Sequence, residues 1–374
     1  MVRLIKSSFL FGVLLLVVAL VGMGTVPLCD YQSFNTNISD LDIGFSYHYY
    51  NDPYGLSEQD VSEGELHIGY DRLYDSPDFG FDITVMNDMN ISTLTLSSFL
   101  VTGEGNLRRY FTTDAPYFGI AGVSARSASS YETIGLFVKL GIGYGRFTDV
   151  TPLAKAIKID AHLYEKGSIS AHLDQTVLKS LAYEIDNIDT YDSMTALLRS
   201  LQQIIEGPST SELDQLDALD VYEMARIVED KDYTRYCGGS INVGIGYEIL
   251  DPMGRSNDLL ATAAFNYAFT TTPQAQFLIK GVFSGTYDFL RTNQIEITAC
   301  YDYFISNIVN LSSKYSFSRE TWDGTATDKH NLKFDLVLTP VEGANITLGF
   351  QFGHEPYFLE WSQDVKFTIG ISLL

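Results

Sequence analysis

Alternate glycines in LFVKLGIGYGRF, residues 136–147, are a pattern that can serve cofactor chemistry. A dinucleotide-binding loop needs Gly-x-Gly-x-x-Gly after a buried strand, so that backbone N–H groups and a helix N-terminus bind the pyrophosphate. Arg146 stands where the third glycine is required, and the helical sequence that follows is not a crossover within a parallel sheet. The motif therefore does not predict a nucleotide site, and we expect no cofactor.

Acid–base chemistry is the second candidate. His48 and His67 share a predicted face with Asp42 and Glu65, and such groups can transfer protons in a hydrolase. The expected register separates the two histidines along the strands, so the favoured interpretation is a polar wall. The chain has no Gly-x-Ser-x-Gly and no His-Glu-x-x-His motif. We expect no catalytic residues, no metal site and no enzymatic activity, and a membrane hydrolase is the weakest function considered.

The first 24 residues have the parts of a secretory signal peptide: a basic start, the apolar stretch 9–21 and a small-residue site ending at Gly24. An uncleaved anchor is the alternative, but the stretch is shorter than the roughly 20 apolar residues that a transmembrane helix needs. We expect the mature chain to be exported.

Composition narrows the function classes. The chain has 24 Tyr and 23 Phe, yet only 19% of its residues are charged, which suits a protein that turns aromatic side chains toward lipid. Its formal charge of −23 argues against nucleic acid as a partner, because that binding needs a basic surface. Three cysteines are too few for a disulfide framework, and a Cys29–Cys237 pair and two unpaired thiols both stay open.

Alternation of apolar and polar residues dominates the chain and predicts β-strands. In 241–249 the odd positions are Ile, Val, Ile, Tyr and Ile, while the even positions are polar or glycine; 41–49 and 365–373 follow the same rule. The strands are long enough, at roughly 10 residues, to cross a bilayer when tilted. Aromatic residues lie near the ends of their apolar faces, as in an interfacial girdle. A soluble β-sandwich is the alternative. The alternation is weak over 90–111.

Residues 150–232 follow a helical period instead. Ile169, Leu173, Val177, Leu181 and Ile185 recur every fourth position on one predicted helix face. We expect a weaker helix over 152–165, a further helix through 194–205 that stops at Gly207, and a last one that begins with a capping box at Ser209 and Glu212. The polar faces are acidic, but the spacing lacks the pattern of a calcium loop.

The signal peptide, the alternation and the strand that runs to the C-terminus together resemble bacterial outer-membrane β-barrel proteins. The resemblance implies a mostly β fold, an antiparallel transmembrane β-barrel of about 14 strands with an all-α insertion of about 80 residues. The expected divisions are 1–24, 25–149, 150–232 and 233–374. The implied location is the outer membrane, and the implied partners are its lipid bilayer and the outer-membrane assembly machinery.

The inner face of such a barrel predicts a channel. About fourteen strands enclose more space than their side chains fill, because around eight already fill a barrel. The first hypothesis is a passive or gated channel for small solutes, and the alternative is an anchoring barrel whose insertion binds a periplasmic partner. The candidate lumen-lining residues mix charges, polar groups and glycines: Asp42, His48, His67, Asp82, Lys139, Gly141, Gly143, Gly145, Asn242, Gly244, Gly246, Lys280, Glu296, Asp302, Lys333 and Asp335.

Two questions about the insertion stay open. An even strand count before it predicts the periplasmic side, where both termini of such barrels lie, but the helices could plug the lumen or lie below it. The facing glycines of 141–145 and 244–246 make room either for an inserted helix or for sharp curvature, because glycine in a strand often marks a close approach or a bend.

Overall fold

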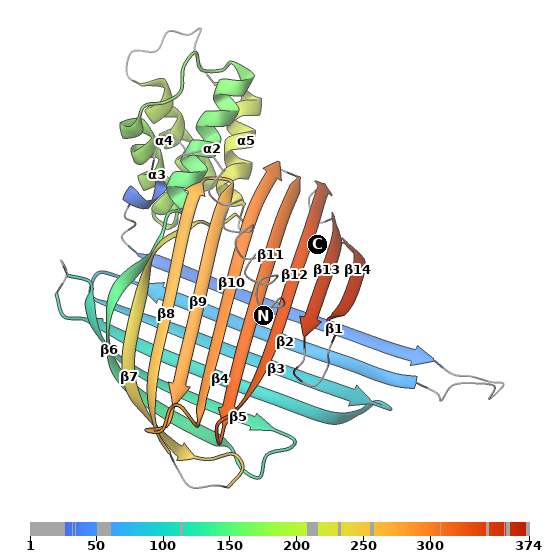
Figure 1. Cartoon of the computed structure of the whole chain (residues 1–374). Coiled ribbons are helices and arrows are strands. Elements are labelled where there is room, and N and C mark those ends of the chain that lie inside the picture. Colours follow the sequence, from blue (N-terminus) through green and yellow to red (C-terminus); the bar gives the residue numbers. More distant parts are fainter. Residues whose placement is uncertain are drawn as a thin grey trace.

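The structure, a computed structural model, describes residues 27–371 apart from 32, 34, 51–60, 113–114, 208–215, 231–232, 255–257, 307, 342–343, 355 and 357–359. The expected signal peptide, 1–24, lies outside the described residues. The chain is mostly β: fourteen strands form one antiparallel sheet in sequence order, which curves into a barrel-like shape with a helical insertion (Figure 1). Within the described residues, each strand pairs with the next from β1 to β14, and no pairing joins β14 to β1.

Six strands precede the insertion, and eight follow it, as the strand count predicted. The first six are β1 Thr36–Tyr50, β2 Val61–Asp75, β3 Phe79–Ser92, β4 Thr95–Tyr110, β5 Tyr117–Ala128 and β6 Gly135–Asp149. The last eight are β7 Tyr236–Leu250, β8 Leu259–Thr272, β9 Ala275–Gly285, β10 Asn293–Ser306, β11 Val309–Trp322, β12 Thr325–Val341, β13 Ala344–His354 and β14 Ser362–Ile371.

The weak alternation over 90–111 contains a tight turn and a whole strand. Thr93 and Leu94 have φ values of 52° and 59°, so the chain reverses there between β3 and β4. Two consecutive positive φ values are typical of the two-residue turn that matches the twist of a hairpin. No glycine marks this turn, which is why the sequence pattern blurs at this point.

Opposite faces of the sheet differ in chemistry. The odd residues of β7 are exposed on the outer face, with Ile241 at 53% and Ile245 at 61% exposure, while Asn242 and Gly244 are half-buried on the inner face. On β14 the register places Val365 and Phe367 on the outer face and Asp364 and Lys366 on the inner face, and all four are exposed. Because neighbouring side chains on a strand point to opposite faces, the alternation produces an apolar outer surface and a polar inner one.

The insertion contains four α-helices: α2 Thr151–Lys166, α3 Gln175–Asp186, α4 Met194–Glu206 and α5 Ala218–Glu229. α3 starts later than the period through Ile169 predicted, because the Asp174 carboxylate accepts hydrogen bonds from the first free N–H groups of the helix. α5 begins at a capping box formed by Asp217 and Asp220. The predicted box at Ser209 and Glu212 lies outside the described residues. α4 ends at Gly207, as predicted.

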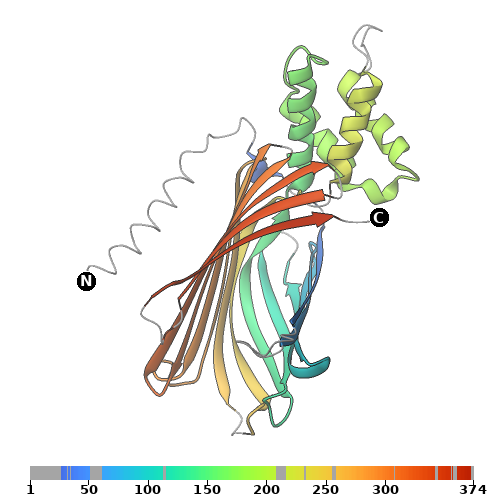
Figure 2. The same ribbon diagram turned by 90° about the vertical axis from the view of Figure 1, so that its right-hand side faces the viewer.

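The helices pack into a module with a core of its own, beyond the strand ends (Figures 1 and 2). Of the two placements that the sequence left open, a plug inside the barrel and a module beyond it, the views show the second: the helices do not enter the space that the sheet encloses. The module lies at the end of the sheet that carries Leu28, the C-terminal end of β14 and short connections such as 273–274. We call this end of the sheet the terminus end. No described helix is long and apolar enough to cross a membrane.

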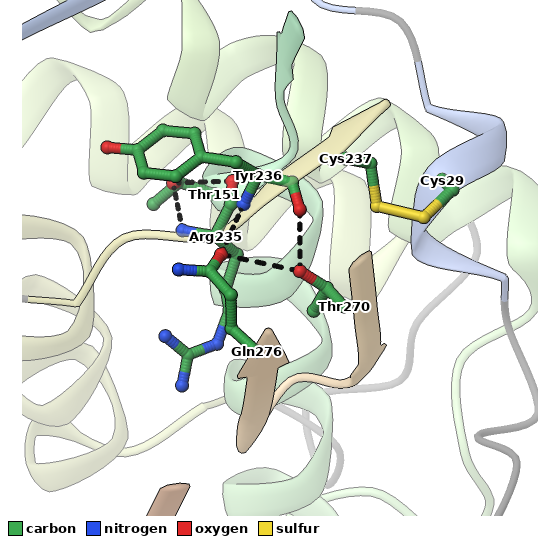
Figure 3. The surroundings of a disulfide bond; sticks show 7 residues. All are labelled: Cys29, Thr151, Arg235, Tyr236, Cys237, Thr270 and Gln276. Carbon is green, nitrogen blue, oxygen red and sulfur yellow. Dashed lines mark hydrogen bonds between the residues drawn. A yellow bond between two sulfur atoms is a disulfide. The ribbon is translucent and has the colours of Figure 1, made fainter. Parts of the chain in front are cut away.

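A disulfide joins Cys29 to Cys237 and answers the question that the sequence left open (Figure 3). Cys29 belongs to the short helix η1, Leu28–Asp30, and Cys237 is the second residue of β7. Leu28, the first residue of η1, and Tyr31, which follows η1, are buried in the core of the helical module. The bond therefore fastens the start of the described chain to the point where the sheet resumes after the insertion.

Candidate functional site

The candidate lumen-lining residues lie on one face of the sheet. Directly opposed residues of an antiparallel pair share a face, and the register opposes His67 to Asp88, Lys139 to Gly246 and Gly141 to Gly244. The side chain of Asp42 lies outside the described residues, although its backbone opposes Gly69. The register carries the same face through Asp82, Asn242, Lys280, Glu296, Asp302, Lys333 and Asp335, and also through His48, Gly143, Gly145 and Gly244.

Two lysines on this inner face are paired with carboxylates. Lys139 Nζ lies 2.6 Å from Glu104 Oε1, and Lys333 Nζ lies 2.8 Å from Asp335 Oδ2. Both pairs are partly exposed on the concave side, so solvent screening keeps each one weak. Each pair brings one positive and one negative charge together, so the net charge of the inner face is close to zero at these two places.

The register keeps His48 and His67 apart on the inner face. The register opposes His67 to Gly44, four positions from His48 on β1, and the His67 Nδ1 atom lies 2.5 Å from Asp88 Oδ1. In the part of the chain that the structure describes, no group of three or more His, Cys, Asp or Glu side chains is arranged to hold a metal ion. The inner-face histidines are placed as polar wall residues.

The glycines of β6 and β7 allow neighbouring groups to approach. A Cβ on Gly141 would lie 2.4 Å from the Val243 carbonyl oxygen, and one on Gly143 would lie 2.3 Å from Cζ of Phe118. Gly145 has a φ of +110°, which disfavours any side chain. Backbone and aromatic rings, not an inserted helix, occupy the room that the glycines leave.

A cluster of buried side chains, which we call the constriction, lies on the inner face near the terminus end. We use this name for Thr36, Asp75, Arg108, Tyr110 and Phe118, which are all buried. The Tyr110 hydroxyl donates to Asp75 Oδ2 at 2.9 Å, the Tyr110 ring packs edge-on against Phe118, and an Arg108 nitrogen lies 3.6 Å from Asp82 Oδ1.

Strands that are not neighbours in the sheet meet at the constriction. The Thr36 hydroxyl of β1 accepts from the Asp149 backbone N–H of β6 at 3.0 Å. The Arg146 guanidinium of β6 lies 4.1 Å from the ring centroid of Tyr110 on β4, and it donates to the Pro77 carbonyl. β1 and β6 thus approach each other across the inner side, and the constriction fills the space between them.

None of the constriction residues was among the candidates predicted from the sequence. The available signal was a pair of aromatic residues, Tyr110 and Phe118, at even positions, where the alternation elsewhere puts polar residues. The residues next to Asp75 in the sequence do not predict its role, because the groups that contact it come from β4 and β6. Only the curvature of the sheet brings these groups together.

A cavity of about 270 Å³ opens on the inner face toward the other end of the sheet, and we call it the inner pocket. Strands β4 to β10 line it. Four charged side chains contribute, Glu104, Arg126, Lys139 and Glu248, together with hydroxyl, amide and apolar groups. Lys139 pairs with Glu104, and an Arg126 nitrogen lies 3.5 Å from Glu248 Oε1.

The helical module meets the sheet at Arg235, which is 2% exposed. Its guanidinium donates to the carbonyls of Pro273, Thr234 and Gln274, and its Cζ lies 4.8 Å from the ring centroids of both Tyr233 and Phe304. Nearby, the Tyr236 N–H donates to the Gln276 side chain, which Figure 3 shows beside the disulfide. This junction fixes the segment that leads from the helical module into β7 to the β8–β9 turn.

Two lysines of α2 face the same junction. Lys155 donates to the Val228 carbonyl at 2.7 Å, near the C-terminus of α5, where a positive charge is favourable. Lys158 lies over the ring of Tyr233. Burial lowers the pKa of both lysines, and Asp230 acts in the opposite direction.

Comparison with known proteins leaves the family open. No family model matches the chain, and no curated protein matches it. Among solved structures, the CymD monoaromatic hydrocarbon channel aligns over 92% of this chain and 88% of its own, with 8% identity and a TM-score of 0.24. A similarity at that level carries no conclusion about what this chain does.

Proposed function

We propose that this protein is an outer-membrane channel for small solutes, gated at the constriction. The observation that carries the proposal is the division of the long strands into an apolar outer face and a charged, polar inner face. An apolar band facing lipid and a wet interior are what a transmembrane barrel requires. A buried wall with this mixture of charges is costly unless the charges are hydrated or paired.

The constriction supplies the gate in this proposal. It is built from a hydrogen bond, a ring contact and charged groups, not from backbone pairing, so it opens without breaking the sheet. Contacts of this kind contribute about 0.5–1.5 kcal/mol each. A gap of a few kcal/mol between closed and open states gives a small but measurable open population.

Conductance in planar bilayers tests the proposal. We expect the folded full chain to give brief openings and Tyr110→Phe, which loses the bond to Asp75, to open more often. Tyr117→Phe is the matched control, since Tyr117 is 57% exposed on the outer face. If the parent chain and Tyr110→Phe both insert into bilayers and neither conducts, the channel proposal is overturned.

An anchoring role is the second candidate, favoured by the separate core of the helical module. The module is fixed to the sheet at Arg235 and by the disulfide, so the sheet would hold it at a defined orientation to a periplasmic partner. Replacing 151–230 by a short Gly/Ser turn tests this. If the protein is a channel, conductance persists in the shortened variant. If the protein is an anchor, the full chain captures a periplasmic protein that the shortened variant does not capture, and neither form conducts.

A further inference from the structure

The inner pocket has no net charge, because its four charged side chains are two bases and two acids. Each base is engaged by an acid: Lys139 by Glu104 at 2.6 Å and Arg126 by Glu248 at 3.5 Å. An ion that entered would lose hydration and find each opposite charge already paired. Transfer of an uncompensated charge out of water is far more costly than transfer of a hydroxyl or an amide.

Glycines make these pairs possible. Lys139 on β6 reaches Glu104 on β4 across β5, where a Cβ on Gly122 would lie 2.7 Å from the Lys139 Cε. Arg126 on β5 reaches Glu248 on β7 across β6, where a Cβ on Gly135 would lie 2.8 Å from the Arg126 Cγ. Each pair bridges the strand between, so the charges lie flat on the wall and the pocket stays open.

The remaining lining is amphipathic. Ser124, Asn242, Thr262 and Ser284 provide hydroxyl and amide groups that both donate and accept hydrogen bonds. Apolar surface comes from Phe137, Leu260 and Val282, and Val282 is 52% exposed although its register places it on the inner face. The volume of the inner pocket is about 270 Å³.

We infer that the inner pocket binds small uncharged solutes that carry a hydroxyl or amide group on a short apolar skeleton, and that its paired charges discriminate against ions of the same size. This inference rests on the proposed function, since it names the solute class that the channel would admit. It assigns the selectivity to the two charge pairs of the pocket and not to the constriction.

The test uses three probes with one skeleton: 1-butanol, butyrate and butylammonium. Saturation-transfer NMR on the full chain folded in detergent reports which probe contacts the protein. We expect about a tenfold preference for butanol, which corresponds to about 1.4 kcal/mol. Ala264→Trp fills the pocket and abolishes the butanol signal. Ala261→Trp, on the exposed outer face of the same strand, is the control that leaves it unchanged.

Charge variants give the decisive pattern. Glu104→Gln leaves Lys139 uncompensated and should admit butyrate, whereas Lys139→Met leaves Glu104 uncompensated and should admit butylammonium. Equal signals from all three probes, or the same preferences in both variants, would overturn the inference. Failure of the channel alone looks different: the pocket keeps this binding pattern while planar bilayers show no conductance. Conductance without this binding pattern would contradict the inference about the pocket and would support the channel proposal.

Discussion

Arg235 is the residue on which the junction between the helices and the sheet depends. Its planar guanidinium donates from three nitrogens in different directions to backbone carbonyls, and two aromatic rings cover it. Lysine can carry the charge but cannot reproduce this fork. The residue stabilises through geometry as much as through charge.

Arg235→Lys should therefore destabilise the junction by about 2–3 kcal/mol, since buried carbonyls lose hydrogen bonds to a charged donor. Hydrogen exchange of peptides from α2 and α5 measures the loss. The matched control is Arg199→Lys, at an exposed position on α4. Equal protection in the two variants would show that Arg235 does not fix the module.

Asp217 gives a pH-dependent prediction. Its hydrogen bond from Lys166, followed by backbone N–H groups at the start of α5, holds its pKa below the usual range. A carboxyl with a lowered folded pKa stabilises above its unfolded pKa, and this contribution is lost as the pH falls through the folded value, below about pH 4. Asp217→Asn should flatten that loss.

The measurement is hydrogen exchange of α5 at several pH values, corrected for intrinsic exchange rates. Asp189→Asn changes an exposed carboxyl away from this contact and should keep the acid dependence of the parent. An unchanged slope in Asp217→Asn would contradict the role of the capping box.

The individual elements show where sequence patterns are reliable. β7 and β14 could be placed with the correct faces because alternation over nine or more residues has one solution on a two-sided sheet. β4 could not be delimited, because its hairpin turn uses Thr93 and Leu94 instead of glycine. α3 was extended too far, because Ile169 and Leu173 pack on the core before the helix begins.

The faces of β7 carry a direct test. Ile245→Arg puts a charge on the exposed apolar face near the middle of the strand and should cost roughly 2–4 kcal/mol in a bilayer. Asn242→Arg puts it on the inner face and should cost much less. Unfolding in urea from lipid vesicles gives both values, and equal costs would contradict the register.

At the scale of the whole molecule, some features follow from the alternation of residues along single strands and others depend on how the sheet curves. Strand number, the side of the insertion and the inner-face residues follow from alternation and parity. The constriction, the pairs across Gly122 and Gly135 and the position of the helices beyond the sheet depend on curvature. Side chains from β2, β4 and β6 meet only because the sheet bends. In the sequence, glycines are a weak indication of this bend, because the residues that lie beside each glycine in space cannot be predicted from it.

At this scale the disulfide is the feature to test. In the chain-entropy model, a link across 208 residues stabilises by about 5 kcal/mol, because it restricts the unfolded chain. Cys29→Ser should lower the temperature at which the folded form converts to the slower-migrating form on gels without reductant. Cys300→Ser, at the free cysteine, is the control and should leave that temperature unchanged. If the two variants behave alike, the link contributes nothing to stability.

Because Cys29 and Cys237 are joined, β1 to β6 and the whole helical module lie inside one covalent ring, while β8 to β14 form an open tail. A single protease cut within the ring leaves one connected molecule on a non-reducing gel, whereas a cut in the tail releases a fragment. Under the proposed function, the ring would insert into a bilayer as a closed loop once the bond has formed. The strands of the tail lie outside that loop, so they could be added one hairpin at a time.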